Sequence, residues 1–592
     1  ALACAVLAAL AAVLARCAFY GSHSPDESYY LAVPYRVYLG DALLIDEWQG
    51  SQFSAFLLYL PLTLFIRFTG STDGILLFFR ILFVICQTLV SFFVFIKVKR
   101  FGILTGLCSA GLFLLYVPEF MEALDYYTMS MMAVELIVVI LFFSDRITAA
   151  KGVAVGILAA CAVVSLPMLA FVYFVYAAAV PIAGIRSRKT KHPARGILSL
   201  RFFCSVTAGI LLIFILFLFF LAARAPLNAY LKNIGNLFSG YDYVLSSANR
   251  ERRNTFNYFA VVKNLFRLQP VGFLLSLLIT VGLVIDRRRL AHRTFWCALL
   301  SVFYVYYAVS MLCGIPGRLE QSLLCPYILY MFTIHCYILT EKRNRKLLFV
   351  LCGGGAYILC LGAASAVFQY VGVLGCVIGN TAFAPVVKDL HRELRCVSTD
   401  FCNRDKRRFE RRVPAILTAA CVVCAVGIAL GCGGSLAVSD RVDSGLRWDG
   451  EPIRETVENG PMKGIIVSQR EKAVYDRVSA DIGLIHELAP GGLYIEGRLP
   501  VGYLMSDARV CACSAWYVDN PELTERYYEA DPNRIPQAVY LPTEDIYADE
   551  ELFRFLIQMF IRDYGKTHPL FADYERIKGE AGYILLAPDV RE

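Results

Sequence analysis

The chain has 592 residues, of which 58% are hydrophobic and 18% are charged. Soluble globular proteins are roughly half apolar, so this composition excludes an ordinary soluble protein and indicates a polytopic membrane protein. The formal net charge is +8, but the chain contains no nucleic-acid-binding motif, and we expect no nucleic-acid partner. Most of the 20 cysteines lie in apolar runs, where cysteine behaves as a small hydrophobe, and no spaced CxxC pair suggests zinc.

A transmembrane helix needs about 20 predominantly apolar residues. Runs of this kind predict about thirteen spans, near residues 1–20, 74–96, 102–118, 130–144, 149–166, 168–185, 199–222, 271–285, 294–312, 322–340, 347–367, 371–386 and 414–434. We interpret the first run as an anchor rather than a cleaved signal peptide, because it has no basic segment before it and is too long for a signal core.

The loops between these spans alternate in charge. Lysine and arginine cluster in every second loop, at 97–100, 146–151, 186–195, 287–293, 342–346 and 388–412. Such enrichment is typical of the cytoplasmic side, so the N-terminus is predicted to be cytoplasmic in a multi-pass protein of the cell membrane. The loops 21–73, 119–129 and 223–270, and everything after residue 435, are then predicted to lie outside.

The polar stretch 22–52 is the most acidic segment near the predicted membrane. It has one basic residue, Arg36, and five acidic ones, Asp26, Glu27, Asp41, Asp46 and Glu47. Charge at a membrane edge is unfavourable unless it is paired, binds a ligand or faces a wet cavity. The stretch is therefore our candidate functional site. The alternative is a solvated loop with ordinary turn acids, the role that we assign to Asp46 and Glu47.

The apolar stretch 53–68 is short for a span and contains Pro61 and Arg67. We predict a juxtamembrane helix here, because a further span would carry the acidic loop to the basic side of the membrane.

From residue 435 the composition becomes that of a soluble protein. Short apolar runs predict strands at 464–468, 492–497, 537–542 and 582–588, and helical spacing occurs at 470–487 and 548–563. The chain thus divides into a transmembrane domain, 1–434, and an external α/β domain, 435–592. The second domain has no phosphate-binding loop and no nucleophile elbow. We expect it to help hold an acceptor, to cover a cavity, or to serve only as a structural cap.

The first hundred residues carry three linked features: the motif Asp26-Glu27-x-x-Tyr30, the pair Gly40-Asp41, and an apolar stretch with Pro61. In a long external loop that precedes about a dozen spans, they resemble the membrane glycosyltransferases of the GT-C superfamily, fold and topology included. The nearest likeness is to family 39, the protein O-mannosyltransferases and the bacterial lipid A aminoarabinose transferase. The C-terminal domain resembles those of bacterial members, which favours a glycan or lipid acceptor over a protein.

The resemblance implies transfer of a hexose or pentose from a polyprenyl-phosphate donor to an acceptor hydroxyl at the outer face of the membrane, with inversion at the anomeric carbon. A carboxylate can serve as general base for the hydroxyl. Asp26 is the predicted base, and Glu27 supports it or orients the acceptor. The expected partners are the lipid-linked donor, a glycan or lipid acceptor of the cell envelope, and membrane lipids.

A fixed cation near the departing phosphate would stabilise its charge. The candidates are Arg318 in an external turn, Arg224 at the end of a span, and Arg80 within the second span. Two alternatives stay open: Arg80 pairs with a carboxylate or carbonyl of another helix, and Arg318 extends to the membrane interface.

The second external loop holds Glu119, Glu122 and Asp125. In a helical loop, Glu122 and Asp125 would be neighbours, and with Asp26 they could bind a hard divalent cation such as Mg²⁺ or Mn²⁺. Some GT-C enzymes use such a metal and others do not. Tyr30 could stack on a sugar ring, although the aromatic belt of a membrane interface explains it equally well.

Two other classes of function compete with this interpretation. A transporter or flippase of lipid-linked glycans would also be polytopic, but the spans show no internal repeat of the kind that many transporters have. A membrane sensor without catalytic activity would bind its ligand on the external domain, and would leave the Asp26-Glu27 pair unexplained.

Overall fold

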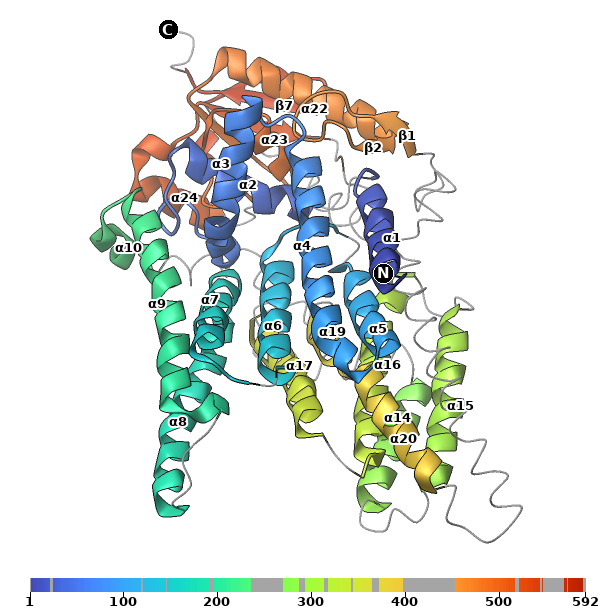
Figure 1. Ribbon diagram of the computed structural model, residues 1–592. Helices are drawn as coiled ribbons and strands as arrows, with labels where there is room; N and C mark the ends of the chain where they lie inside the picture. The colour runs from blue at the N-terminus through green and yellow to red at the C-terminus, as the bar shows by residue number, and fades with distance from the viewer. Residues whose placement is uncertain are drawn as a thin grey trace.

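The computed structural model describes residues 2–21, 25–118, 121–144, 146–190, 196–235, 270–286, 293–312, 318–341, 344–364, 372–397, 453–516, 521–543, 546, 569–571 and 573–588. Within these ranges a long helical part carries a mixed α/β domain at one end, drawn in orange to red (Figure 1). The predicted span 414–434, the predicted helix 548–563 and Glu119 lie outside the described residues.

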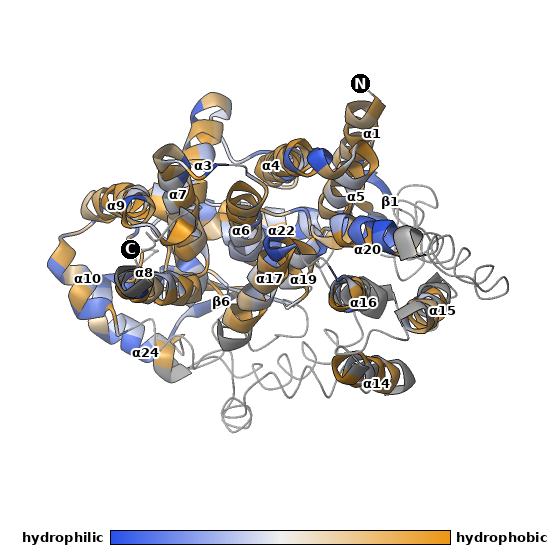
Figure 2. Ribbon diagram, turned by 60° about the horizontal axis from the view of Figure 1, so that its bottom comes forward, coloured by the Kyte–Doolittle hydropathy of each residue, from blue (hydrophilic) through white to orange (hydrophobic). Residues whose placement is uncertain are grey.

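Helices occupy every predicted span within the described residues. They are α1 (Leu2–Cys17), α4 (Ile75–Val98), α5 (Ile103–Leu114), α6 (Tyr126–Phe142), α7 (Ala149–Ser165), α8 (Ala170–Thr190), α9 (Leu200–Ala222), α14 (Pro270–Asp286), α15 (Arg293–Leu312), α16 (Arg318–Leu339), α17 (Arg345–Ala364), α19 (Val373–Asn380) and α20 (Phe383–Val397). Hydrophobic residues run along most of α4, α6, α7 and α9, whereas hydrophilic ones gather on α20 and on helix α22 of the α/β domain (Figure 2). Apolar runs become helices in a bilayer because a helix satisfies its own backbone hydrogen bonds.

Not all of these helices are long enough to cross a membrane alone. In the described part of the chain, four segments are each both long enough and apolar enough to cross a membrane: residues 50–69, 75–101, 167–186 and 200–222. The bent pair α19 and α20 would make a fifth, and the other apolar helices are shorter. The fold is therefore that of a helical membrane protein, while the count of thirteen spans stays a prediction.

The predicted span 371–386 is not a straight helix, because the chain bends by 47° between α19 and α20. Pro385 stands four residues after Thr381 and lacks the N–H that a continuous helix would donate to the Thr381 carbonyl. Instead, the Ser109 hydroxyl donates to that carbonyl at 3.0 Å. The Thr381 hydroxyl in turn donates to Glu135 at 2.7 Å. Side chains of α5 and α6 thus stabilise the break.

Helices α7 and α9 approach closely through two glycines. A Cβ added at Gly156 would overlap the Val206 carbonyl, and one added at Gly209 would overlap the Val153 carbonyl. Small residues at a crossing let helix backbones approach and gain van der Waals contact in a membrane.

We expect Gly156→Ala to separate α7 from α9 and to lower the free energy of unfolding by about 1–3 kcal/mol, the usual effect of overpacking. Thermal unfolding of the purified protein in detergent measures it. Gly184→Ala on α8 is the matched control, since nothing lies within 4 Å of a Cβ there. Equal stability of the two variants would contradict the close-packing explanation.

Between α1 and α4 the chain forms α2 (Pro25–Leu39), the 3-10 helix η1 (Gly50–Ser54) and α3 (Ala55–Thr69). The turn after α3 is bonded to the α/β domain: the Thr72 hydroxyl donates to Leu504 at 2.7 Å, and the Gly460 N–H donates to Asp73 at 3.1 Å. Helix α3 therefore stands beside the α/β domain (Figure 1). Because segment 50–69 is also long and apolar enough to cross a membrane, the juxtamembrane helix stays a prediction.

The α/β domain contains a five-stranded sheet in the order β4-β3-β5-β7-β6. Its strands are β3 (Gly492–Ile495), β4 (Arg509–Val510), β5 (Ala538–Pro542), β6 (Glu575–Lys578) and β7 (Gly582–Leu586). Strand β3 is parallel to β4 and β5, with Leu493 opposite Val510 and Ala538, whereas β7 is antiparallel to β5 and β6. The strands predicted at 492–497, 537–542 and 582–588 are confirmed, whereas β4 and β6 were missed.

A separate two-stranded sheet ties the α/β domain to the first helix. Strand β1 (Ile453–Thr456) pairs with β2 (Ile466–Ser468), within the strand predicted at 464–468. The chain that leaves α1 lies along β2: the Gly21 N–H donates to the Ile466 carbonyl, and the Ile466 N–H donates to Phe19, both at 2.7 Å. Helix α22 (Gln469–Leu488), predicted at 470–487, follows with a capping box of Ser468 and Glu471. Two short helices, α23 (Pro500–Leu504) and α24 (Pro521–Ala530), were not predicted.

Candidate active site

Helix α2 begins with proline followed by two acids. Pro25 has the fixed φ of a first helical position, and Asp26 and Glu27 lie in the first turn, where negative charge suits the helix dipole. Consecutive helix residues point about 100° apart. The two carboxylates therefore face different surroundings: Glu27 is buried, whereas Asp26 is half-buried.

Glu27 pairs with Arg80 of α4. The Arg80 guanidinium donates to both carboxylate oxygens, at 2.5 and 2.8 Å, and to the carbonyls of Ala18 and Gly21 at 3.0 and 2.9 Å. Both side chains are buried. Of the two alternatives left open for Arg80, the structure shows the one in which Arg80 pairs with a carboxylate of another helix. The role of Glu27 in supporting Asp26 or orienting the acceptor stays a prediction. Their pairing fixes the start of α2 against α1 and α4.

Asp26 lies within electrostatic reach of Asp125. Burial raises the pKa of Asp26 to about 6, and the Arg498 guanidinium opposes that rise. Burial raises the pKa of Asp125 to about 7, against hydrogen bonds from Thr128, and the charge of Asp26 adds to the rise. A carboxyl group with a pKa near 6 can accept a proton at neutral pH. Asp26 thus combines partial exposure with a pKa near neutral.

Asp125 is the N-cap of α6. Its carboxylate accepts from the Thr128 N–H at 2.5 Å, and the Thr128 hydroxyl closes a capping box. Residues 121–125 are not helical, so the prediction that Glu122 and Asp125 are neighbours on a helix is wrong: the capping box starts the helix only after Asp125. In the described part of the chain, no three His, Cys, Asp or Glu side chains are placed to hold a metal ion. Within the described residues, the predicted set of Asp26, Glu122 and Asp125 therefore does not form a site for a divalent cation.

Aromatic rings line the surroundings of the two aspartates. Tyr30 is buried, with its ring 5.5 Å from that of Tyr126 and 5.2 Å from that of Tyr29. The Tyr29 ring lies 5.5 Å from that of Trp516 in the α/β domain. The Trp516 ring in turn has the Arg498 guanidinium over it, at 5.8 Å from the ring centroid. Tyr30 thus belongs to an aromatic layer that joins α2, α6 and the α/β domain.

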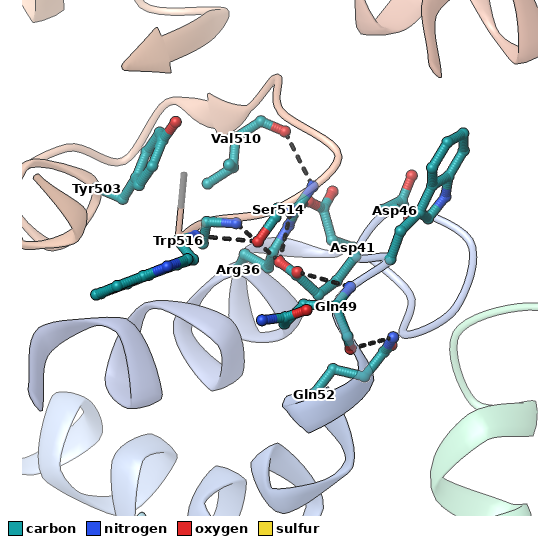
Figure 3. A network of polar contacts seen from close by, with 12 residues as sticks. Arg36, Asp41, Asp46, Gln49, Gln52, Tyr503, Val510, Ser514 and Trp516 are labelled. Carbon is teal, nitrogen blue, oxygen red and sulfur yellow. Dashed lines mark hydrogen bonds and ion pairs between the residues drawn. The ribbon is translucent and has the colours of Figure 1, made fainter. Parts of the chain in front are cut away.

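The second half of the acidic stretch forms a buried ionic network with the α/β domain (Figure 3). The Arg36 guanidinium donates to Asp41 at 2.7 Å, to Glu47 at 2.9 Å and to the Val510 carbonyl at 3.2 Å. Glu47 also accepts from the Ala515 N–H at 2.9 Å. We call this set of contacts the Arg36 network. It joins helix α2 to the loop after β4.

Asp46 and Glu47 are buried, with 7% and 1% of their surface exposed, so the prediction that they are ordinary turn acids of a solvated loop is wrong. Glu47 belongs to the Arg36 network. Asp46 pairs with Arg534 at 3.0 Å and with Arg509 at 3.5 Å. Both acids are buried because the α/β domain supplies cations and N–H groups that no inspection of the loop alone could reveal.

The two other predicted phosphate ligands have different positions. Arg224 follows α9 and donates to the Tyr59 hydroxyl of α3 at 2.6 Å, with its guanidinium 5.5 Å from the Tyr59 ring centroid. It therefore links α9 to the juxtamembrane helix. Arg318 is the first residue of α16, and its side chain lies outside the described residues.

Arg498 and Trp516 are candidate site residues that sequence reasoning missed. They lie in loops that follow β3 and β4, two adjacent parallel strands. In open sheets, ligands bind beyond the carboxyl ends of parallel strands. The run Gly492–Ile495 followed by Glu-Gly-Arg was the available signal, but it required knowing that β3 has parallel neighbours.

No protein-family model matches the chain. No curated protein matches it. Several solved structures are similar to it. ArnT from Cupriavidus metallidurans in the apo state is 10% identical with a TM-score of 0.48, and 98% of this chain and 97% of that chain are covered. The same protein bound to undecaprenyl phosphate is 11% identical with a TM-score of 0.46, covering 99% and 98%. The Archaeoglobus fulgidus oligosaccharyltransferase AglB, in complex with an inhibitory peptide and a dolichol-phosphate, is 12% identical with a TM-score of 0.43, covering 91% and 69%. The roles proposed for individual residues rest on contacts within this chain.

Proposed function

We propose that the chain is a glycosyltransferase that moves a sugar from a polyprenyl-phosphate donor to a hydroxyl of a glycan or lipid acceptor. The observation that carries this proposal is the carboxyl group of Asp26. It is half-buried at the start of α2, its pKa is raised to about 6, and it lies beside a second carboxyl and a guanidinium where the helical part meets the α/β domain. The alternating basic loops support a cytoplasmic N-terminus, which would put this site at the outer face of the membrane.

The proposed reaction is a single displacement. Asp26 accepts the proton of the acceptor hydroxyl as its oxygen attacks the anomeric carbon. The bond between that carbon and the phosphate oxygen breaks, and the polyprenyl phosphate leaves with the bonding electron pair, so the configuration inverts. The ion pair of Glu27 and Arg80 keeps α2 in place, and the cap of Asp125 fixes the start of α6 beside it. Such positioning contributes to the rate because the reacting groups are held in attacking geometry.

The experiment supplies purified protein in liposomes with polyprenyl-phosphate-linked sugars and a panel of glycan and lipid acceptors, and detects products by mass spectrometry. A new glycosidic bond with release of the polyprenyl phosphate is the expected result. Movement of the donor across the bilayer with no new bond would contradict the proposal and identify a transporter. Mass spectrometry of lipid that co-purifies with the protein selects the donors to test first.

The rate of transfer should depend on pH through Asp26. A base acts only when deprotonated, so kcat/KM should fall about tenfold per pH unit below the pKa of about 6 and level off above it. Initial rates between pH 4.5 and 8.5 measure the profile. A profile that falls as pH rises through 6 would show that the essential group acts as an acid.

A further inference from the structure

A cavity of about 350 Å³ lies between helix α20 and the 3-10 helix η2 (Lys99–Phe101), which joins α4 to α5. That volume falls in the range of small-ligand sites. Helix α4 begins beside the α/β domain, where the Leu76 N–H donates to the Pro461 carbonyl, and its 24 residues extend for about 36 Å before η2. The cavity is therefore at the end of the helical part away from the α/β domain, where Figure 1 shows α20. The alternating basic loops predict that this end is cytoplasmic.

The lining of the cavity is rich in charge. Three cations, Arg100, Lys388 and Arg392, and two acids, Asp389 and Glu393, give it a net charge of +1. The four of these residues on α20 are at positions i, i+1, i+4 and i+5, so they share one face of that helix. Hydrophilic residues mark α20 in Figure 2. Helix α20 is thus an amphipathic helix whose charged face borders the cavity.

Two of the cations are positioned by backbone carbonyls. The Lys388 ammonium donates to the Phe101 carbonyl, and a Cβ added at Gly102 would lie 2.9 Å from that ammonium. The Arg100 guanidinium donates to the Phe142 carbonyl at 3.3 Å. A carbonyl carries no net charge, so these bonds fix the direction of the two side chains without neutralising them.

The two acids of the lining have partners of their own. Glu393 accepts the Glu341 N–H at 2.9 Å, just after the end of α16. Asp389 lies 3.9 Å from the Arg392 guanidinium, a long separation for an ion pair. The acids therefore help to hold α20 in place, and the excess charge that borders the cavity is positive.

The surface next to the cavity is apolar. Ile103 and Leu104 open helix α5 close behind η2, with 65% and 80% of their surface exposed, and Ile96 is exposed on the last turns of α4. A soluble phosphate ester would gain nothing from these side chains, whereas the acyl chains of a lipid would cover them and remove them from water. A charged cavity beside exposed apolar helix surface suits a molecule with both an anionic head and an apolar tail.

We propose that this cavity binds the phosphate of an anionic phospholipid, such as phosphatidylglycerol, from the cytoplasmic leaflet. Basic pockets between helices at that side of a membrane suit acidic headgroups, because the surface of the leaflet is negatively charged. Lys388 and Arg392 approach the phosphate from α20, and Arg100 approaches it from η2. A lipid bound in this way bridges α20 to the turn between α4 and α5, and it does so independently of sugar transfer at the other end of the helices.

Native mass spectrometry of the full-length protein in detergent, titrated with phosphatidylglycerol, tests the proposal. Phosphatidylcholine with the same acyl chains is the lipid control. One cation near a lipid headgroup contributes about fivefold to binding. The double variant Lys388→Gln, Arg392→Gln should therefore bind phosphatidylglycerol about 25-fold more weakly than wild type, with phosphatidylcholine binding unchanged. Lys388→Arg keeps the charge and should retain most of the affinity.

Arg201→Gln is the matched control variant. Arg201 is an exposed arginine at the start of α9, a helix that does not line the cavity. The double variant should keep its fold, because Lys388 and Arg392 are exposed, and thermal unfolding in lipid-free detergent checks this. The single variant Lys388→Gln, with an expected loss of about fivefold, tests the same cavity with a smaller change.

Glycerol 1-phosphate distinguishes a lipid headgroup from a soluble phosphate ester. Its failure to displace phosphatidylglycerol would support the lipid, whereas displacement at comparable affinity would overturn the lipid assignment. Equal phosphatidylglycerol affinity of the double variant and wild type would overturn the proposal. An equal loss in Arg201→Gln would also overturn it, since binding would then reflect attraction to a basic surface rather than to this cavity.

Discussion

Asp26→Asn is expected to lower the rate of sugar transfer by about 10²- to 10⁴-fold, the usual contribution of a general base. The amide has nearly the shape of the carboxyl group but cannot accept the proton of the acceptor hydroxyl. The variant should still fold, because Asp26 is half-buried and the start of α2 is fixed by the pair of Glu27 and Arg80. Initial rates with purified protein, at saturating and at limiting donor, measure the effect.

Asp476→Asn is a suitable control, because Asp476 forms an exposed pair with Lys472 on α22. Any residual transfer by Asp26→Asn should no longer slow down as the pH falls below about 6. Transfer at the wild-type rate would exclude Asp26 as the base. If the rate of the variant still fell below pH 6, the titrating group would be a residue other than Asp26.

Arg36→Met is expected to lower the free energy of unfolding by about 3–5 kcal/mol, because it removes the cation that lies between the buried acids Asp41 and Glu47 and leaves Asp41 only the longer pair with Arg509, at 3.5 Å. Burial already raises the pKa of both acids, and Arg36 is the main group that opposes the rise. In the variant both should take up protons more readily. A carboxyl group whose pKa is raised in the folded state is neutral there at low pH, and it destabilises the fold as the pH rises and its charged form has to be buried. The loss of unfolding free energy caused by Arg36→Met should therefore be smaller near pH 5 than near pH 8.

A thiol-reactive fluorescent dye can follow this unfolding during heating in detergent, because Cys511 and Cys513 are free and buried within the α/β domain. Lys472→Met removes a solvent-exposed pair with Asp476 and serves as the control, with little change expected. An Arg36→Met protein as stable as this control at both pH values would show that the Arg36 network does not hold the domains together.

The positions of the helices could be predicted because each is a local apolar run, and the strand predictions succeeded for the same reason. The break after Asn380 could not be predicted from Pro385 alone. Pro385 has no N–H to donate to the Thr381 carbonyl, and the structure compensates because the Ser109 hydroxyl donates to that carbonyl instead. The two acids of α2 could not be told apart from sequence. Which carboxylate is buried depends on where Arg80 of another helix lies.

The candidate site was predicted only in its first half. Asp26 and Asp125 both lie in segments that the charge pattern predicted to be external loops at the membrane, so their positions pointed to them before the structure placed Asp26 in α2 and Asp125 at the start of α6. Arg498 and Trp516 come from the far end of the chain, and their approach to α2 follows from the parallel order of β4, β3 and β5. No local pattern records which edge of a sheet will face a distant helix.

The pairing of residues 19–21 with β2 has a consequence for the order of assembly. A chain is synthesised from its N-terminus, so the segment between α1 and α2 waits for its strand partner until Ile466 has been made. We expect the start of α2 to be fixed only once the α/β domain has been made and has docked. A chain cut short before that point would lack the backbone pairing of residues 19–21 with β2.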